Sequence, residues 1–270
     1  MIMDIKLNQN TTNKKQNLSK PSAKQKANND TKFNSETQNN NISTDETTTR
    51  NLTIRESLQK GPREKWSFIT HFASAILATF ATLFLFFSNI EHIHQDTGRL
   101  ITMTLFGLSM IVLYSCSSIY HFSNGSAKVQ LHLRKLDHAM IYALIAGSYT
   151  PVLYNGFEAP KSTFFLIGIW AFMLVGVIVK LFWLNAPRWL STAVYVIMGW
   201  SIIIDPKALF SLPSDFLILL LAGGISYTIG AILYVLKKPN FCEAFGFHEI
   251  FHCFITLGSA FHFVGLVLYL

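Results

Sequence analysis

Residues 247–270 read FHEIFHCFITLGSAFHFVGLVLYL, an apolar run with two histidines near its start. A helix that crosses a bilayer needs about 20 mostly apolar residues, and this run is long enough. His248 and His252 are four residues apart, so a helix places both imidazoles on one face. Ionisable side chains at membrane depth are costly, and they mark functional sites. The stretch therefore predicts a membrane helix with a polar site at its beginning.

Six further stretches of the chain are apolar and of similar length. They cover residues 68–87, 100–120, 139–154, 163–183, 189–204 and 216–236. The third and fifth runs are short, and we expect each to extend by a turn, the third back to Leu136. Helices are expected because backbone groups in hydrocarbon must be paired internally and no barrel-like alternation is visible. The predicted fold is an all-α integral membrane protein with seven transmembrane helices.

The basic residues at the ends of these runs predict the orientation in the membrane. With a cytoplasmic N-terminus, the inner side carries seven basic residues and the outer side three. They are Lys128, Arg134, Lys135, Lys180, Arg188, Lys237 and Lys238 against Arg99, Lys161 and Lys207. Cytoplasmic loops are enriched in Lys and Arg. We therefore expect the N-terminus to be cytoplasmic, the C-terminus to be outside, and the protein to be a multi-pass protein of the cell membrane.

Residues 1–62 have a different composition from the rest of the chain. They contain ten Lys and Arg against six Asp and Glu, with almost no aromatic residues. Such a segment cannot bury enough apolar surface to offset its conformational entropy. We predict a disordered, mildly basic arm over residues 1–62, either solvated near anionic lipid or binding a partner, and a membrane domain over residues 63–270. Membrane lipids and a lipid-like substrate are the expected partners, and nucleic acid is not.

Polar residues from other runs are expected at the same depth as the two histidines of the last run. Span two ends on the cytoplasmic side with Ser117 and His121, and span three begins on that side at Asp137. Span seven also begins there with His248 and His252. The sequence therefore predicts that these five residues meet near the inner face of the membrane.

Three histidines in such a cluster have the chemistry of a metal site. Three histidines and a water form an open, reactive zinc site. Neutral imidazoles suit zinc, no Cys or Met accompanies them for copper(I), and the non-haem iron site needs a carboxylate ligand. We predict Zn²⁺ bound by His121, His248 and His252. The alternative is that the pair on the last span makes only a hydrogen-bonded contact between helices.

Asp137 and Ser117 are the candidate catalytic residues beside these histidines. A carboxylate near a three-histidine zinc can hold a water molecule and take its proton. Ser117 precedes His121 by four residues, so its hydroxyl can bond that water or a developing oxyanion. The alternative for Asp137 is a cap at the start of its helix. The alternative for Ser117 is a hydrogen bond to the carbonyl four residues before it.

These residues also fall in motifs that resemble a known family. The matching segments are SSIYH at 117–121, KLDH at 135–138, GSYTP at 147–151 and GFHEIFH at 246–252. They resemble the haemolysin III branch of the progestin and adipoQ receptor family, and the resemblance covers about residues 62–270. The family also has a first motif of Glu, Asn and His. This chain reads EKWSFITH at 64–71, with Ser67 where Asn is usual.

The resemblance implies a seven-helix membrane protein with zinc near its inner face. The zinc would be bound by His121, His248 and His252, and Asp137 would contact it through water. The family looks related to alkaline ceramidases, which implies hydrolysis of a lipid amide at the cytoplasmic leaflet. Alternatives are a receptor or sensor with structural zinc and a membrane-disrupting haemolysin. His71 is expected in a polar network with Glu64 rather than on the metal.

Overall fold

The computed structural model describes residues 61–91, 93–242 and 245–270. The arm predicted over residues 1–62 lies outside this part, except for its last two residues. Within the described residues all regular elements are helices, apart from one isolated β-bridge between Cys242 and Phe245. The all-α prediction is confirmed.

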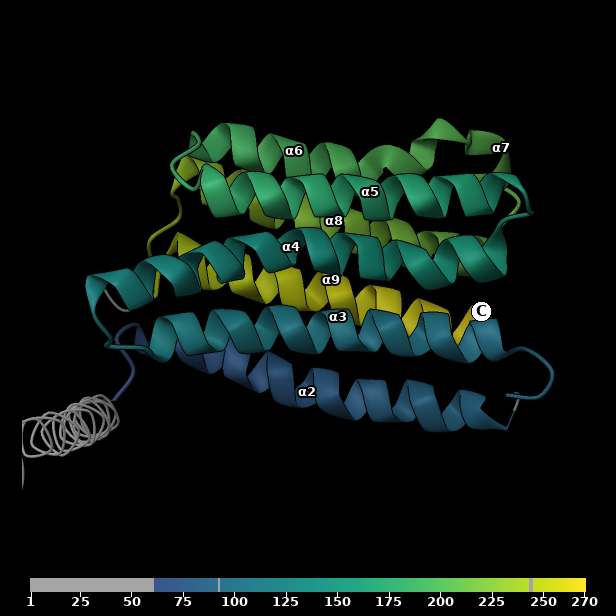
Figure 1. Ribbon diagram of the computed structural model, residues 1–270, viewed down its shortest axis with the longest axis horizontal. Helices are drawn as coiled ribbons and strands as arrows, with labels where there is room; N and C mark the ends of the chain where they lie inside the picture. The colour runs from purple at the N-terminus through teal and green to yellow at the C-terminus, as the bar shows by residue number, and fades with distance from the viewer. Residues whose placement is uncertain (1–60, 92, 243–244) are drawn as a thin grey trace, which may run out of the picture. The chain divides into compact units, whose positions relative to one another are not determined.

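The helices run side by side as a bundle (Figure 1). In chain order they are α2 (Lys65–Ile90), α3 (Thr97–Phe122), α4 (Ala127–Gly156), α5 (Lys161–Phe182), α6 (Arg188–Trp200), the 3₁₀ helix η1 (Ser201–Ile204), α7 (Pro206–Leu209), α8 (Ser214–Leu236) and α9 (Phe247–Tyr269). Neighbours along the chain pack together from α2 to α5, and α8 packs on α9. The last helix also packs against α2, which joins the beginning and the end of the bundle.

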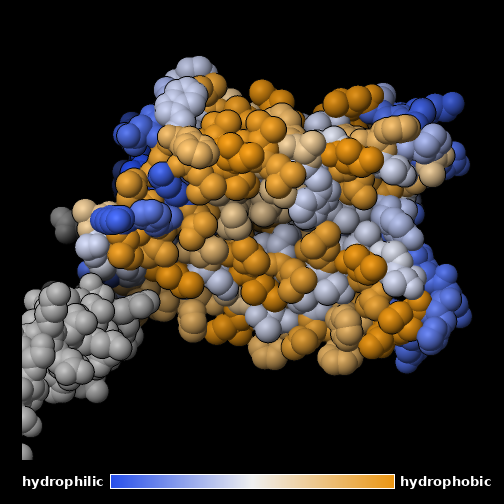
Figure 2. Space-filling view, viewed as in Figure 1, coloured by the Kyte–Doolittle hydropathy of each residue, from blue (hydrophilic) through white to orange (hydrophobic). Residues whose placement is uncertain are grey.

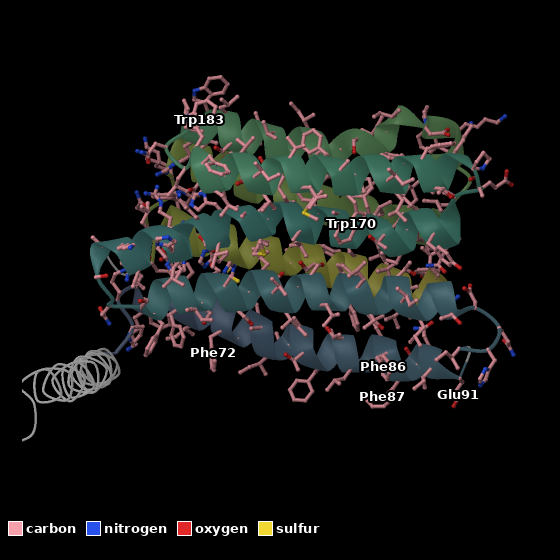
Figure 3. All side chains as sticks on the ribbon, viewed as in Figure 1. Phe72, Phe86, Phe87, Glu91, Trp170 and Trp183 are labelled. Carbon is pink, nitrogen blue, oxygen red and sulfur yellow. The ribbon has the colours of Figure 1, made fainter. Side chains whose placement is uncertain are left out.

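Five of the described helices are long and apolar enough to cross a membrane, namely α2, α3, α5, α8 and α9, and residues 188–204 form a shorter apolar helix. Figure 2 shows an apolar belt across the middle of the bundle with hydrophilic residues at both ends. Phe72 and Phe87 point outward from α2 (Figure 3), and both are about half exposed or more, at 49% and 62%. The structure is that of a multi-pass membrane protein. The count of seven spans and the sides of the termini stay predictions.

Helix α4 differs from the third predicted span at its beginning. It starts at Ala127, about three turns before the expected extension to Leu136. Lys128, Arg134 and Lys135 therefore lie on a helix and not in a loop. The reason is that eight of the ten residues at 127–136 are Ala, Lys, Gln, Leu or Arg, which are good helix formers in water. The length of an apolar run predicts only the part of a helix that lies in hydrocarbon. Residues of high helix propensity extend the helix beyond that part.

Glycines allow close approach where α4 meets α3. A Cβ added at Gly147 would collide with the side chain of Ser109 on α3. Small residues at such contacts let the backbones of membrane helices approach closely. Close packing matters there because the hydrophobic effect does not drive helices together within lipid. By contrast, a Cβ at Gly168 on α5 would meet nothing within 4 Å.

We expect Gly147→Leu to lower the free energy of unfolding by about 1–3 kcal/mol, because the added side chain forces α3 and α4 apart. Thermal unfolding of the purified protein in detergent measures the effect. Gly168→Leu is the matched control, and its melting temperature should stay close to that of the wild type. Equal melting temperatures for the two variants would contradict the close packing of α3 on α4.

Candidate metal centre

Three histidines from two helices meet at one end of the bundle. His121 ends α3, and His248 and His252 lie in the first two turns of α9. One ring nitrogen from each lies within 4.8 Å of the other two. His121 and His252 are each only 1% exposed. The structure thus brings together the three residues that the sequence nominated as metal ligands, and these three can hold a metal ion.

The spacing of the nitrogens suits zinc. The Nε2 atoms of His121 and His248 are 3.3 Å apart. Two nitrogens bound at about 2.0–2.1 Å to one tetrahedral zinc lie about 3.3–3.4 Å apart. Two imidazole lone pairs at this distance repel each other unless a proton or a cation lies between them. The donor set therefore fits the predicted group.

A carboxylate orients His121. The Nδ1 of His121 donates to Glu64 Oε2 at 2.5 Å, so its Nε2 is left free to bind an ion. This hydrogen bond is the main cause that lowers the pKa of the Glu64 carboxyl, while partial burial opposes the shift. Glu64 reaches His121 because its backbone N–H donates to the His121 carbonyl at 3.1 Å. The segment before α2 therefore lies across the end of α3.

A hydroxyl on α2 orients His252 in the same way. Thr70 Oγ1 lies 3.0 Å from His252 Nδ1. The single proton of this hydroxyl is directed to the helix carbonyls of Trp66 and Ser67, at 3.0 and 2.9 Å. The hydroxyl therefore accepts from the Nδ1–H of His252, and Nε2 of that ring is the atom left for a metal. Glu64, just before α2, and Thr70 on α2 thus support two of the three imidazoles, while α2 contributes none of the candidate ligands.

The expected pairing of His71 with Glu64 is wrong. His71 is 3% exposed, and neither ring nitrogen has a hydrogen-bond partner among the described residues. Its ring stacks on His252, with centroids 3.5 Å apart and planes at 13°. Glu64 instead stands before the first turn of α2 and turns toward α3. Sequence spacing along α2 could not reveal this, because the contact depends on how the preceding segment crosses another helix.

The two candidate catalytic residues lie beside the histidines. Asp137 on α4 interacts electrostatically with His121 and faces Ser117 on α3. The Ser117 hydroxyl is fully buried, and Asp137 is the polar group that it faces. The alternative reading of Ser117 as bonded to the carbonyl four residues before it is not what the structure shows.

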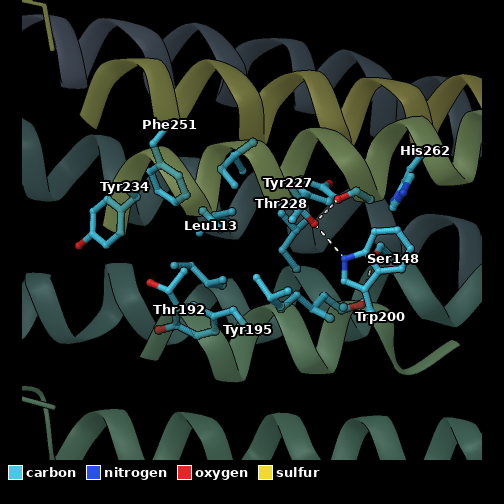
Figure 4. A pocket seen from close by; sticks show the side chains of 18 of the residues that line it. Leu113, Ser148, Thr192, Tyr195, Trp200, Tyr227, Thr228, Tyr234, Phe251 and His262 are labelled. Atoms are coloured by element: carbon cyan, nitrogen blue, oxygen red, sulfur yellow. Dashed lines mark hydrogen bonds between the residues drawn. The ribbon is translucent and has the colours of Figure 1, made fainter. Parts of the chain in front are cut away.

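Asp137, Ser117 and two of the histidines line a cavity of about 340 Å³. Small-molecule sites in proteins are about 300–1,000 Å³ and mostly apolar, with a few convergent polar groups. Its walls come from α3, α4, α5, α6, α8 and α9, and Figure 4 shows Tyr195, Tyr234 and Phe251 among them. The polar cluster forms one end of this cavity, so a bound molecule would bring one of its ends to the histidines.

Removing the groups that orient the imidazoles is expected to weaken zinc binding. Partners of this kind typically contribute about 10–100-fold to metal affinity. We therefore expect Glu64→Ala to lower zinc affinity by about that factor, and Thr70→Val to lower it less, because the lost group is neutral. Competition with a chelator on the purified protein measures both.

Thr79→Val is the control for these two variants. Thr79 is an exposed threonine on the same helix, and its hydroxyl donates to its own helix carbonyl at Ala75. Zinc affinity should be unchanged in this variant. Affinity unchanged in all three variants would mean that the hydrogen bonds from α2 do not support a metal ion.

Comparison with known proteins places the chain in a family. Residues 60–263 match the family described as "Haemolysin-III related". The chain belongs to the haemolysin-III family. The match covers the whole site, from Glu64 to His252, and leaves out only the arm and the last residues of α9.

Two bacterial relatives of this haemolysin-III chain cover most of it. The "Hemolysin-3 homolog" of Bacillus subtilis (strain 168) is 36% identical over 202 residues, which is 74% of this chain and 91% of the relative. "Hemolysin-3" of Bacillus cereus is 37% identical over 202 residues, 74% of this chain and 89% of the relative. The "Adiponectin receptor protein" of Drosophila melanogaster is 28% identical over 218 residues, 73% of this chain and 48% of that protein. This similarity supports placement within the wider progestin and adipoQ receptor family.

Proposed function

We propose that the protein is a zinc-dependent hydrolase that cleaves a lipid amide at the cytoplasmic leaflet. The observation that carries the proposal is that ring nitrogens of His121, His248 and His252 lie within 4.8 Å of one another at the polar end of a largely apolar cavity. Two of these nitrogens are 3.3 Å apart, as two ligands of one zinc ion would be. A lipid that enters this cavity presents its head-group end to the histidines. The orientation predicted from loop charges puts this end at the inner face.

Each polar residue at this end of the cavity would have a separate role in the hydrolysis of an amide. His121, His248 and His252 would hold the zinc, which when bound lowers the pKa of a coordinated water to about 7 and polarises a carbonyl. Asp137 would orient the attacking water and take its proton. Ser117, which is buried beside Asp137, would donate its hydroxyl to the oxygen that becomes negative in the transition state.

A second function is favoured by the way the site joins the helices. The candidate ligands come from α3 and α9, and two of them are oriented by Glu64, which precedes α2, and by Thr70 on α2. A zinc ion there would link three helices, as a structural metal does. In that case the protein is a receptor or sensor, and loss of the metal lowers stability with no turnover to lose. The third candidate, membrane disruption, predicts leakage of dye-loaded liposomes that does not depend on zinc.

One experiment separates these functions. Zinc is quantified in the purified full-length protein, which is then incubated with mixed lipid amides, wild type against His252→Ala, and the products are identified by mass spectrometry. The hydrolase predicts a free fatty acid and an amine from the wild type only. Bound zinc with no zinc-dependent product across the panel would favour the structural role, and absence of zinc would refute both.

A further inference from the structure

A buried lysine stands in the wall of the cavity without an acidic partner. Lys180, near the end of α5, is 2% exposed, and its Nζ donates to Ser191 Oγ at 2.5 Å. The same Nζ lies 6.0 Å from the centre of the Tyr195 ring. No ion pair with a carboxylate is formed by Lys180 within the described ranges. Burial of an unpaired charge is costly, so a buried cation of this kind calls for an anion.

Two arginines add to the positive charge at the same end of the cavity. Arg134 of α4 and Arg188 of α6 line it together with Lys180. All three cations act electrostatically on His138, which lines the same cavity. Asp137 is the sole carboxylate among the described residues that line the cavity. Arg134 is exposed to solvent, and the Arg188 guanidinium donates to the Tyr234 carbonyl at 3.3 Å. Cations thus outnumber carboxylates at this end, and Lys180 is the one of the three that is buried.

Beyond this charged end the cavity is a long apolar channel. On α4 its lining runs from Asp137 to Val152, and 15 residues of α-helix correspond to about 22 Å. Leu209 and Phe210 line its far end. One leaflet contributes about 15 Å of the roughly 30 Å hydrocarbon core, so the channel is longer than one leaflet is deep. It has the length and the walls for a single long acyl chain.

We propose that the cavity binds a lipid with a phosphate head group, whose phosphate contacts Lys180, Arg134 and Arg188 and whose acyl chain lies along α4. A phosphate monoester carries about 1.5–2 negative charges at neutral pH, so it can pair with Lys180 and with a second cation at this end. Guanidinium groups also bind phosphate in a bidentate manner. A carboxylate carries one negative charge and a neutral head group none, so each would pair with fewer of these cations. The inference rests on the proposed function only in placing a lipid in this cavity, and it narrows the substrate class to phosphorylated lipids.

Binding to the full-length protein in a neutral detergent tests this head-group preference. The ligands share an oleoyl chain and differ in the head group: oleoyl lysophosphatidate, oleate and oleoylglycerol. Inorganic phosphate alone is the fourth probe. We expect lysophosphatidate to bind about tenfold or more tightly than oleate or oleoylglycerol, because charge-assisted hydrogen bonds form only with its phosphate. Inorganic phosphate at millimolar concentration should not displace it, because the acyl chain contributes to binding. Equal binding of oleate, or displacement by inorganic phosphate, would overturn the proposal.

Substitution of Lys180 tests the residue itself. Lys180→Met keeps the length of the side chain and should weaken lysophosphatidate binding by about tenfold or more, while oleoylglycerol binding stays the same. Lys180→Arg keeps the positive charge and should bind the phosphate lipid like the wild type. Binding by this variant would show that the loss in Lys180→Met comes from the missing charge and not from misfolding. Lys207→Met, an exposed lysine outside the cavity lining, is the matched control and should bind like the wild type. Unchanged lysophosphatidate binding in Lys180→Met would contradict the assignment. Because binding is measured without turnover, failure of hydrolysis and failure of head-group recognition give different results.

Discussion

Replacing His121 with alanine should abolish tight zinc binding. The substitution removes one of three ligands from a buried site, and it also leaves the Glu64 carboxylate without the imidazole that it now contacts at 2.5 Å. Loss of a group that only supports a ligand typically costs about 10–100-fold in metal affinity, so loss of the ligand itself should cost more. The zinc content of the purified variant, measured by elemental analysis, should fall from one ion per chain to a trace.

A buried histidine outside the three candidate ligands provides the control. His262 lies on α9 like two of the ligands, and its Nε2 contacts the Leu220 carbonyl at 3.2 Å, far from the metal centre. His262→Ala should lose packing but keep its zinc. A His121→Ala protein that retains a full equivalent of zinc would show that His121 is not a ligand, whatever the stability of the variant.

Replacing Asp137 with asparagine should remove hydrolysis and leave the metal in place. The amide keeps the shape of the side chain but cannot accept a proton at neutral pH. General base catalysis contributes about 10²–10⁴-fold to a rate, and the release of fatty acid from a lipid amide should fall by a factor in this range. Zinc content should not change, because the three candidate zinc ligands are histidines and Asp137 is not one of them.

Asp215→Asn serves as the matched control for this variant. Asp215 lies exposed in the first turn of α8, and the substitution makes the same chemical change away from the cavity. Its turnover should equal that of the wild type. If Asp137→Asn hydrolysed lipid amides at the wild-type rate, another group would be the base. If it lost its zinc, Asp137 would act through the metal site and not in the reaction.

Much of the fold follows from local features of the sequence. Apolar runs located the long helices because a spanning segment must be apolar along its length, whatever it packs against. The beginning of α4 at Ala127 was missed because its first turns are stabilised by helix propensity, on which hydrophobic length has no bearing. The two histidines of α9 were readable from their spacing, since residues four apart share a face of any helix.

The groups that support the histidines could not be predicted in this way. Glu64 was expected in a polar network with His71, but it contacts His121 because the segment before α2 crosses the end of α3. Thr70 gave no signal at all, because a threonine in a membrane helix normally bonds its own backbone, as this one also does. Lys180 was counted only as a loop charge, and its burial depends on how α5 meets α6.

The separation of the candidate ligands along the chain sets an order on biogenesis. His121 lies on α3, whereas His248 and His252 lie on α9. The three imidazoles can meet only after the ribosome has synthesised α9 and this helix has packed into the bundle. A fragment that ends before α9 would lack two of the three candidate ligands, so it should bind no metal at this site.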